Sequence, residues 1–144
     1  IFDKLSNFFG DLKGKKIGMW GLAFKPETDD IREAPALYTI EKLIEAGAKV
    51  KVFDPEAMDN VKAIFGDKIE YATDQYDALV EADALAIMTE WALFRTPSFD
   101  VMSKVMRAKN IFDGRNLYDL AYVKQAGFYY ESIGRNKIDQ KEKV

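Results

Sequence analysis

Phe24, Lys25, Arg32 and Arg115 are the side chains best suited to ligand binding in this sequence. Each lies just beyond a short apolar run or just before a helical pattern. A lysine binds a phosphate as a point charge, whereas an arginine presents a planar fork of N–H donors. Arg32 also precedes a helical pattern, and the free amides of a helix start attract anions. The set therefore predicts a site for a phosphorylated ligand.

The neighbours of these cations also support a simpler interpretation. Acidic residues next to Arg32 could pair with the cations or cap the helix, and a carboxylate at that place would repel a phosphate. Arg115 could be an incidental surface residue after a turn. Charge and spacing alone leave both interpretations open. The acidic residues are Asp29, Asp30 and Glu33, and the turn is Asp113–Gly114.

The glycines after the first apolar run do not form the usual dinucleotide fingerprint. That fingerprint requires G-x-G-x-x-G and an acidic residue about 20 positions further on. Here Gly18 and Gly21 stand without a third glycine, and Asp54 lies too far along the chain. Because Asp54 precedes a proline, we expect it to start a turn or cap a helix.

Three residues after a later apolar run have equally ordinary interpretations. Trp91 and Phe94 are expected to be core or interface aromatics instead of platforms for a stacked base. Glu90, directly before Trp91, is interpreted as a helix cap.

Composition limits the chemistry that this chain can perform. The 144 residues include no cysteine and no histidine, so thiolate chemistry, disulfides and the commonest general base are absent. No metal site is expected, and a net charge of −3 argues against nucleic-acid binding through bulk charge. The sequence contains no apolar run long enough to span a membrane. We expect a piece of a longer, cytoplasmic protein, since the first residue is isoleucine.

Short apolar runs alternate with helical patterns along most of the chain. This alternation predicts right-handed crossovers and an α/β fold: a three-layer, Rossmann-like domain with a mostly parallel sheet flanked by helices. Helices are expected at 1–12, between Pro35 and Gly47, at Met58–Phe65, at 76–81 and at 99–106. Strands are expected at Lys16–Trp20, Lys49–Phe53, 84–88, 110–112 and 128–131, with a weaker one at 68–71.

The predicted topology gathers the unusual polar residues at one edge. In open α/β sheets, ligands bind beyond the carboxyl ends of the strands. Residues 1–14 are expected to be the end of a helical connector from an upstream region, or an arm that packs on this domain. Residues 15–135 are expected to form the ligand-binding domain, and residues 136–144 are expected to form a solvated tail.

An ordered set of motifs resembles the C-terminal domain of the UDP-glucose/GDP-mannose dehydrogenase family, most closely its UDP-glucose 6-dehydrogenases. The motifs cover nearly everything from residue 15 to residue 135, in the order found in the family. They are GLAFKPETDDIREAP from Gly21, the helix end at Ala46–Gly47, VFDP from Val52, TEW from Thr89, FDGRN from Phe112 and GFYYESIGR from Gly127.

The resemblance implies a three-part enzyme. An upstream Rossmann domain binds NAD, a central helical region forms the homodimer, and the C-terminal domain holds the UDP-sugar. Such enzymes oxidise the C6 alcohol of the sugar to a carboxylate, for example UDP-glucose to UDP-glucuronate. They use two hydride transfers and an upstream catalytic cysteine, so this chain is expected to be inactive alone and to contain no catalytic residue.

The resemblance also assigns roles to the candidate residues. Phe24 and Lys25 are expected to contact the nucleotide and phosphate portion of the UDP-sugar, and Arg115 is expected to reach the substrate as well. Arg32 is expected to lie near the pyrophosphate of NAD, which is held mainly by the upstream domain.

Other functions remain open from the sequence. Relatives in the same family could act on UDP-N-acetylmannosamine or GDP-mannose. A non-enzymatic interaction module, docking through residues 1–12 and Trp91, is a second hypothesis. A self-contained enzyme is disfavoured because nucleophile and base are both missing.

Overall fold

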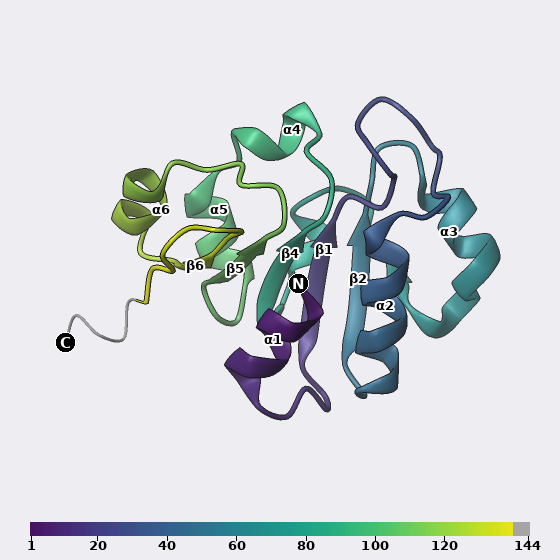
Figure 1. Cartoon of the computed structure of the whole chain (residues 1–144), viewed down its shortest axis with the longest axis horizontal. Coiled ribbons are helices and arrows are strands. Elements are labelled where there is room, and N and C mark those ends of the chain that lie inside the picture. The colour runs from purple at the N-terminus through teal and green to yellow at the C-terminus, as the bar shows by residue number, and fades with distance from the viewer. Residues whose placement is uncertain (140–144) are drawn as a thin grey trace.

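The computed structural model describes residues 1–139, and its centre is a six-stranded sheet with the strand order β3-β2-β1-β4-β5-β6 (Figure 1). All neighbouring strands pair in parallel. This confirms the predicted α/β fold class. The strands are β1 (Lys16–Trp20), β2 (Lys49–Phe53), β3 (Glu70–Tyr71), β4 (Ala84–Ile87), β5 (Asn110–Asp113) and β6 (Tyr129–Glu131).

The strand order reverses between β1 and β4. From β1 the chain moves outward to β2 and β3, and then returns to place β4 on the other side of β1. Gly18 in β1 is accordingly paired with Lys51 of β2 on one side and Leu85 of β4 on the other. A crevice forms at such a switch point, beyond the carboxyl ends of the strands, where open α/β sheets bind their ligands.

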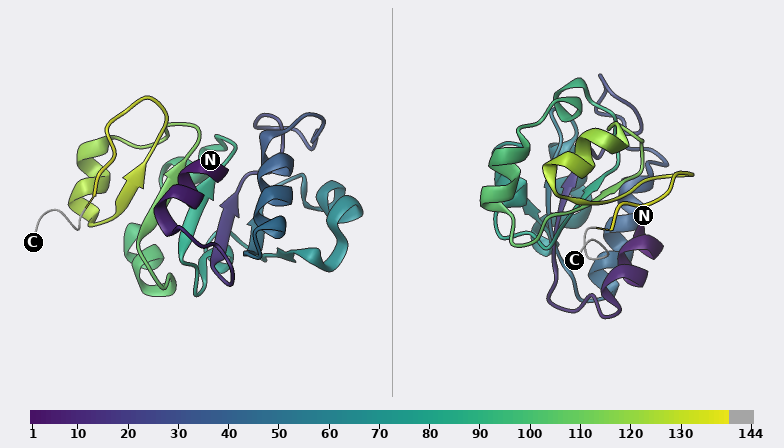
Figure 2. Two further views of the ribbon diagram at one scale, coloured as in Figure 1. Left: turned by 60° about the horizontal axis from the view of Figure 1, so that its bottom comes forward. Right: turned by 90° about the vertical axis from the view of Figure 1, so that its left-hand side faces the viewer.

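Helices cover both faces of the sheet, giving the expected three layers (Figure 2). One face packs against α1, α2 and α3, and the other packs against the one-turn helix η2 and against α4, α5 and α6. The helices are α1 (Phe2–Phe9), α2 (Pro35–Glu45), α3 (Met58–Phe65), α4 (Ala92–Arg95), α5 (Phe99–Val105) and α6 (Leu120–Ala126), with 3₁₀ turns η1 (Gly66–Lys68) and η2 (Asp77–Leu79). Within residues 1–139, no helix has the length and apolar character needed to cross a bilayer.

The central strands are apolar because both of their faces are buried. Ile17 and Met19 of β1 face the α2 layer, whereas Trp20 faces the opposite layer. The Trp20 ring stacks on Phe94 of α4 with a centroid separation of 5.0 Å. Phe94 is therefore a core residue, as predicted.

Most elements form where the sequence predicts them, with two kinds of difference. The helix expected at 76–81 is only the 3₁₀ turn η2, because the chain there lies tightly against β1: a Cβ on Gly18 would approach the Ala78 carbonyl oxygen to 2.6 Å. The short helices α4 and α6 were not predicted. Helix α6 nevertheless has clear end signals, with Asp119 accepting a hydrogen bond at its start and Gly127 in the left-handed conformation at its end.

Helix α1 packs on this domain. Leu5 is fully buried, and the Phe8 ring contacts Phe112 of β5 and Tyr129 of β6, with centroids 5.4 Å and 4.5 Å apart. Lys4 also forms an ion pair of 3.2 Å with Glu131. The helix therefore lies as an arm on the domain, and the expected connection of residues 1–14 to an upstream region stays a prediction.

The segment after residue 135 does not separate from the domain at once. Ile138 pairs with Tyr130 in an isolated antiparallel bridge, with hydrogen bonds of 2.8 Å and 3.0 Å. The half-buried Ile138 side chain packs beside the core, so the expected solvated tail does not begin at residue 136. Residues 140–144 lie outside the described part of the chain.

Candidate functional site

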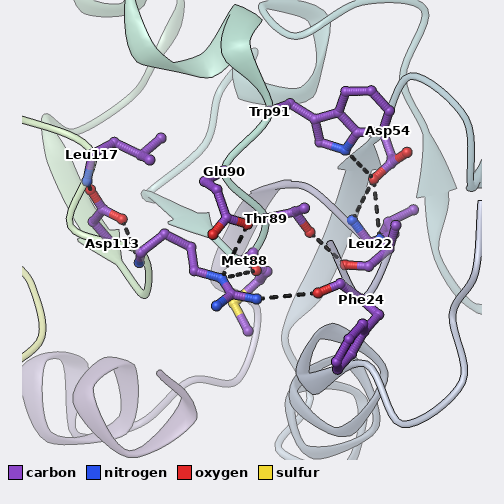
Figure 3. A network of polar contacts seen from close by, with 11 residues as sticks. Leu22, Phe24, Asp54, Met88, Thr89, Glu90, Trp91, Asp113 and Leu117 are labelled. Carbon is purple, nitrogen blue, oxygen red and sulfur yellow. Dashed lines mark hydrogen bonds and ion pairs between the residues drawn. The ribbon is translucent and has the colours of Figure 1, made fainter. Parts of the chain in front are cut away.

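The Arg115 guanidinium links three of the loops that leave the carboxyl edge of the sheet. Figure 3 shows the network of polar contacts that includes Phe24, Met88 and Asp113 from these loops. Its Nε donates a hydrogen bond to the Met88 carbonyl oxygen at 3.0 Å, just after β4. Its Nη2 donates to the Phe24 carbonyl oxygen at 3.3 Å, in the loop after β1. Phe24 and Arg115, predicted to share a ligand, are therefore in direct contact. Arg115 is not an incidental surface residue.

Asp113, the last residue of β5, fixes the loop that carries Arg115. Its Oδ1 accepts a hydrogen bond from the Arg115 N–H at 2.8 Å, and its Oδ2 accepts from the Leu117 N–H at 2.7 Å. The Tyr130 hydroxyl also donates to Oδ2 at 2.7 Å, and the Arg135 Nη2 donates to the same hydroxyl oxygen at 2.8 Å. Burial and the hydrogen bond to Asp113 raise the pKa of Tyr130, so its hydroxyl remains a donor.

Asp54 performs a similar task for the loop after β1. The side chain is 1% exposed, and its Oδ2 accepts from the main-chain N–H groups of Leu22 and Ala23 at 2.7 Å and 3.2 Å. The Trp91 indole donates to the same oxygen at 3.2 Å, while Oδ1 accepts from the N–H groups of residues 56 and 57. The structural interpretation of Asp54 is confirmed. Trp91 is a buried anchor, as expected, because its indole serves this carboxylate.

Gly21 is required where the β1 loop crosses the β4 loop. Its φ is +94°, and an added Cβ would lie 2.5 Å from the Thr89 main-chain nitrogen. Thr89 donates its hydroxyl hydrogen to the Ala23 carbonyl oxygen at 2.7 Å. No larger side chain fits at position 21 without moving one of the two loops.

Phe24 and Lys25 project from the exposed part of the β1 loop. The Phe24 side chain is 50% exposed, and the Lys25 side chain is exposed too. The Phe24 N–H donates to the Asp30 carbonyl oxygen at 2.8 Å, which closes the turn between them. Among residues 1–139, Lys25 forms no ion pair within 4.0 Å. Its ammonium group is thus available to an anion.

Arg32 lies in the same loop but is paired with Asp30. Its Nε and Nη2 donate to the two carboxylate oxygens at 3.0 Å and 2.8 Å. This bidentate pair lowers the pKa of Asp30 to about 2. The Arg32 side chain is 87% exposed, so the pair is weak and a ligand phosphate could displace the carboxylate. The predicted role of Arg32 near a pyrophosphate remains a prediction.

Glu90 faces Arg115 and does not cap a helix. The residue at the start of α4 is Trp91, and no side-chain capping bond is formed there. The Glu90 Oε1 lies 3.8 Å from the Arg115 Nε, with both side chains about one-third exposed, at 31% and 32%. This Oε1 atom is buried and has no hydrogen-bond partner among the described residues. The helix-cap prediction is therefore wrong.

The site offers cations, an exposed aromatic ring and carbonyl groups. Within residues 1–139, no group of three or more potential metal ligands comes together. A doubly wound parallel sheet with cations beyond its carboxyl edge is typical of Rossmann-like domains that bind phosphorylated ligands. The fold and the site define this class.

Within this class, the chain belongs to the UDP-glucose/GDP-mannose dehydrogenase family. The family model for its UDP binding domain matches residues 18–120. UDP-glucose 6-dehydrogenase TuaD of Bacillus subtilis (strain 168) is 43% identical over 138 residues, which make up 96% of this chain and 30% of TuaD. The chain thus spans about a third of the length of that relative.

Solved structures lead to the same family. A UDP-glucose dehydrogenase from Pyrobaculum islandicum superposes with a TM-score of 0.76 and 33% identity, covering 90% of this chain and 28% of that one. A UDP-D-ManNAc dehydrogenase from Pyrococcus horikoshii gives a TM-score of 0.73 and 29% identity, covering 93% of this chain and 29% of that one. Both are larger dehydrogenases that contain a domain of this shape.

Proposed function

We propose that this chain is the nucleotide-sugar-binding part of an NAD-dependent UDP-glucose 6-dehydrogenase. Phe24, Lys25 and Arg115 bind the UDP-sugar at the carboxyl edge of the sheet. The UDP portion anchors the ligand, so that binding energy from a remote part of the substrate positions the C6 alcohol for oxidation elsewhere. The overall reaction converts that alcohol to a carboxylate through two hydride transfers.

The contact between Arg115 and Phe24 is the observation that carries the proposal. These residues are 91 positions apart and come from two different motifs, yet the Arg115 Nη2 donates to the Phe24 carbonyl oxygen. Lys25 follows directly, with its ammonium group exposed. Two residues predicted to bind one ligand thus lie at one place, at the switch point of the sheet.

The residues present suit only a peripheral contact with NAD. When bound, NAD would accept the hydride from the substrate. The acidic residue after β2, which usually binds the adenosine ribose, is not available here, because Asp54 is buried and its carboxylate is occupied by main-chain and indole donors. Arg32, which is exposed and pairs only with Asp30 among residues 1–139, is suited to approach the pyrophosphate from outside. The main NAD site therefore belongs to a separate, upstream domain.

We propose that substrate binding and catalysis lie on different domains of a larger protein. With no cysteine and no histidine in the sequence, this chain has neither a thiol nucleophile nor an imidazole base. We infer that it does not turn over a UDP-sugar alone. In its full-length form it works with an NAD-binding domain and a central helical, dimer-forming region, in the cytoplasm.

The competing hypotheses receive different support. UDP-N-acetylmannosamine remains an alternative substrate, since the UDP portion is common to both nucleotide sugars. An interaction module docking through residues 1–12 and Trp91 is disfavoured. Leu5 and Trp91 are buried in this domain, so they present no docking surface.

Calorimetry with UDP tests the proposal directly. We expect Lys25→Ala and Arg115→Ala each to weaken UDP binding by about tenfold, as expected for the loss of a charged hydrogen bond. Lys104→Ala, which removes a cation from α5, is the matched control and should bind UDP like the unmodified chain. Equal affinity in all four proteins would remove Lys25 and Arg115 from the site.

A further inference from the structure

Arg115 and Lys25 differ in how much of their charge is available to a ligand. The Arg115 Nε and one Nη2 hydrogen are committed to the carbonyl oxygens of Met88 and Phe24. The Glu90 carboxylate lies 3.8 Å from the Nε and offsets the positive charge. Lys25 forms no ion pair within 4.0 Å among the described residues, although Asp30 in the same loop is near enough to interact with its charge.

The Arg115–Glu90 pair presents both kinds of hydrogen-bonding group. A guanidinium has five N–H donors, so both hydrogens of Nη1 and one of Nη2 remain available at Arg115. Glu90 contributes acceptor oxygens and is about one-third exposed. Its Oε1 is buried without a hydrogen-bond partner among residues 1–139, which is costly for a carboxylate oxygen unless a donor reaches the group.

A phosphate is a poor match for this pair. It carries only acceptor oxygens, and its negative charge would lie beside the Glu90 carboxylate. A hydroxyl group both donates and accepts, so it can donate to Glu90 and accept from Arg115 at the same time. Vicinal hydroxyl groups occur in ribose and in hexoses.

We propose that Glu90 is a ligand-binding residue, and that Arg115 and Glu90 together bind vicinal hydroxyl groups of the nucleotide sugar while Lys25 binds its phosphates. This inference rests on the proposed function and assigns the two cations to different parts of one ligand. Glu90 then determines specificity, because it favours a hydroxylated, uncharged group where a lone arginine would attract phosphate.

Ligands that carry different sets of hydroxyl groups test this assignment. Calorimetry compares UDP-glucose, UDP and 2′,3′-dideoxy-UDP on the unmodified chain, on Glu90→Ala and on Glu90→Gln. The UDP-glucose/UDP pair probes hexose hydroxyls, and the UDP/dideoxy-UDP pair probes ribose hydroxyls. Glu56→Gln is the matched control, because Glu56 is an exposed carboxylate that follows β2 at the same edge of the sheet.

We expect one of the two affinity ratios to fall by about tenfold in Glu90→Ala, since a hydrogen bond to a charged acceptor is lost. Glu90→Gln should reduce the same ratio by a smaller factor, because an amide oxygen still accepts. The dideoxy-UDP affinity should be retained or increased in both variants, and Glu56→Gln should change neither ratio. The ratio that falls identifies the sugar that contacts Glu90.

Two results would overturn the inference. Unchanged ratios in both Glu90 variants would show that the residue does not bind hydroxyl groups. A uniform increase in affinity for all three ligands would show that Arg115 binds phosphate. Circular dichroism melting checks folding, and Glu90→Gln decides the outcome if Glu90→Ala is unfolded. Failure of the unmodified chain to bind any of these ligands would overturn the proposed function too, whereas Lys25-dependent binding with unchanged ratios would leave that function intact.

Discussion

The loop of residues 21–34, after β1, and the loop of residues 114–119, after β5, each supply one cation predicted to bind the UDP-sugar, Lys25 and Arg115, but they are held very differently. Loop 114–119 is tied along its length: Asp113 accepts from the N–H groups of Arg115 and Leu117, and the Arg115 guanidinium is bonded to two carbonyl groups. Loop 21–34 is tied mainly at its start, where Asp54 and Thr89 hold residues 22 and 23.

Because the two loops are held differently, Arg115 and Lys25 contribute to binding in different ways. Arg115 is positioned before any ligand arrives, so ordering it costs little conformational entropy. Lys25 is exposed on a loop whose outer part includes two non-glycine residues with positive φ, Glu27 at 64° and Glu33 at 56°. Its four-carbon side chain must become ordered on binding. We therefore expect Arg115 to define orientation and Lys25 to adapt to the phosphate position.

Removing the Asp54 carboxylate should have the largest effect, because it releases the start of loop 21–34. Asp54→Ala leaves the buried N–H groups of Leu22, Ala23 and Ala57 without an acceptor. Because these groups stay buried and unpaired, we expect the free energy of unfolding of Asp54→Ala to be about 4 kcal/mol lower than that of the unmodified chain. Urea denaturation measures it, with Asp29→Ala, an exposed carboxylate of the same loop, as control. Similar losses in both variants would contradict the anchoring role.

Gly21→Ala should separate the two loops at their crossing. The new Cβ would approach the Thr89 nitrogen to 2.5 Å at a φ of +94°, and we expect a loss of stability of about 2–3 kcal/mol. Gly10→Ala is the matched control, since Gly10 has a φ of +75° but nothing within 4 Å. Both glycines have a positive φ, so comparing the melting temperatures of the two variants separates the effect of the steric clash with Thr89 from the effect of the backbone conformation. Equal destabilisation would mean that the crossing is not tight.

Tyr130→Phe should loosen loop 114–119 with a smaller effect. The variant removes the hydroxyl that donates to Asp113 and accepts from Arg135. We expect the free energy of unfolding to fall by about 1–2 kcal/mol. Tyr122→Phe removes an exposed hydroxyl and should leave stability unchanged. If the two variants unfold at the same urea concentration, the Asp113 network contributes nothing to this loop.

The smallest effect concerns the exposed end of loop 21–34. Arg32→Gln should raise the pKa of Asp30 from about 2 part of the way towards its ordinary value, because the side-chain hydrogen bonds and the charge of Arg32 are lost while the main-chain N–H of residue 32 still donates to Asp30. Since the folded-state pKa is the lower one, the pair stabilises the chain above the unfolded pKa and this contribution disappears as the pH falls through the folded value. An NMR titration of the Asp30 carboxyl measures the shift. Arg95→Gln, at another exposed arginine, should leave the titration unchanged, and an unchanged Asp30 in Arg32→Gln would disprove the pairing.

The sequence predicts β1 well because burial on both faces imposes an apolar run, and β2 because its valines alternate with lysines. β1 and β2 have the predicted bounds, Lys16–Trp20 and Lys49–Phe53. The pairing of Arg32 with Asp30 was an open alternative because the two residues are neighbours in the chain. The partners of Arg115 were not predictable, since its carbonyl acceptors come from distant loops whose crossing depends on the whole sheet. The helix-cap prediction for Glu90 fails for the same reason, since the side chain faces Arg115 from a different loop.

Both tryptophans of this chain lie at the carboxyl edge of the sheet. The Trp20 indole donates to the Gln75 carbonyl oxygen at 2.8 Å, and the Trp91 indole donates to Asp54. Tryptophan fluorescence, excited where the seven tyrosines do not absorb, therefore reports on this edge without any label. A change in emission on adding a nucleotide would register a rearrangement around Asp54 in real time.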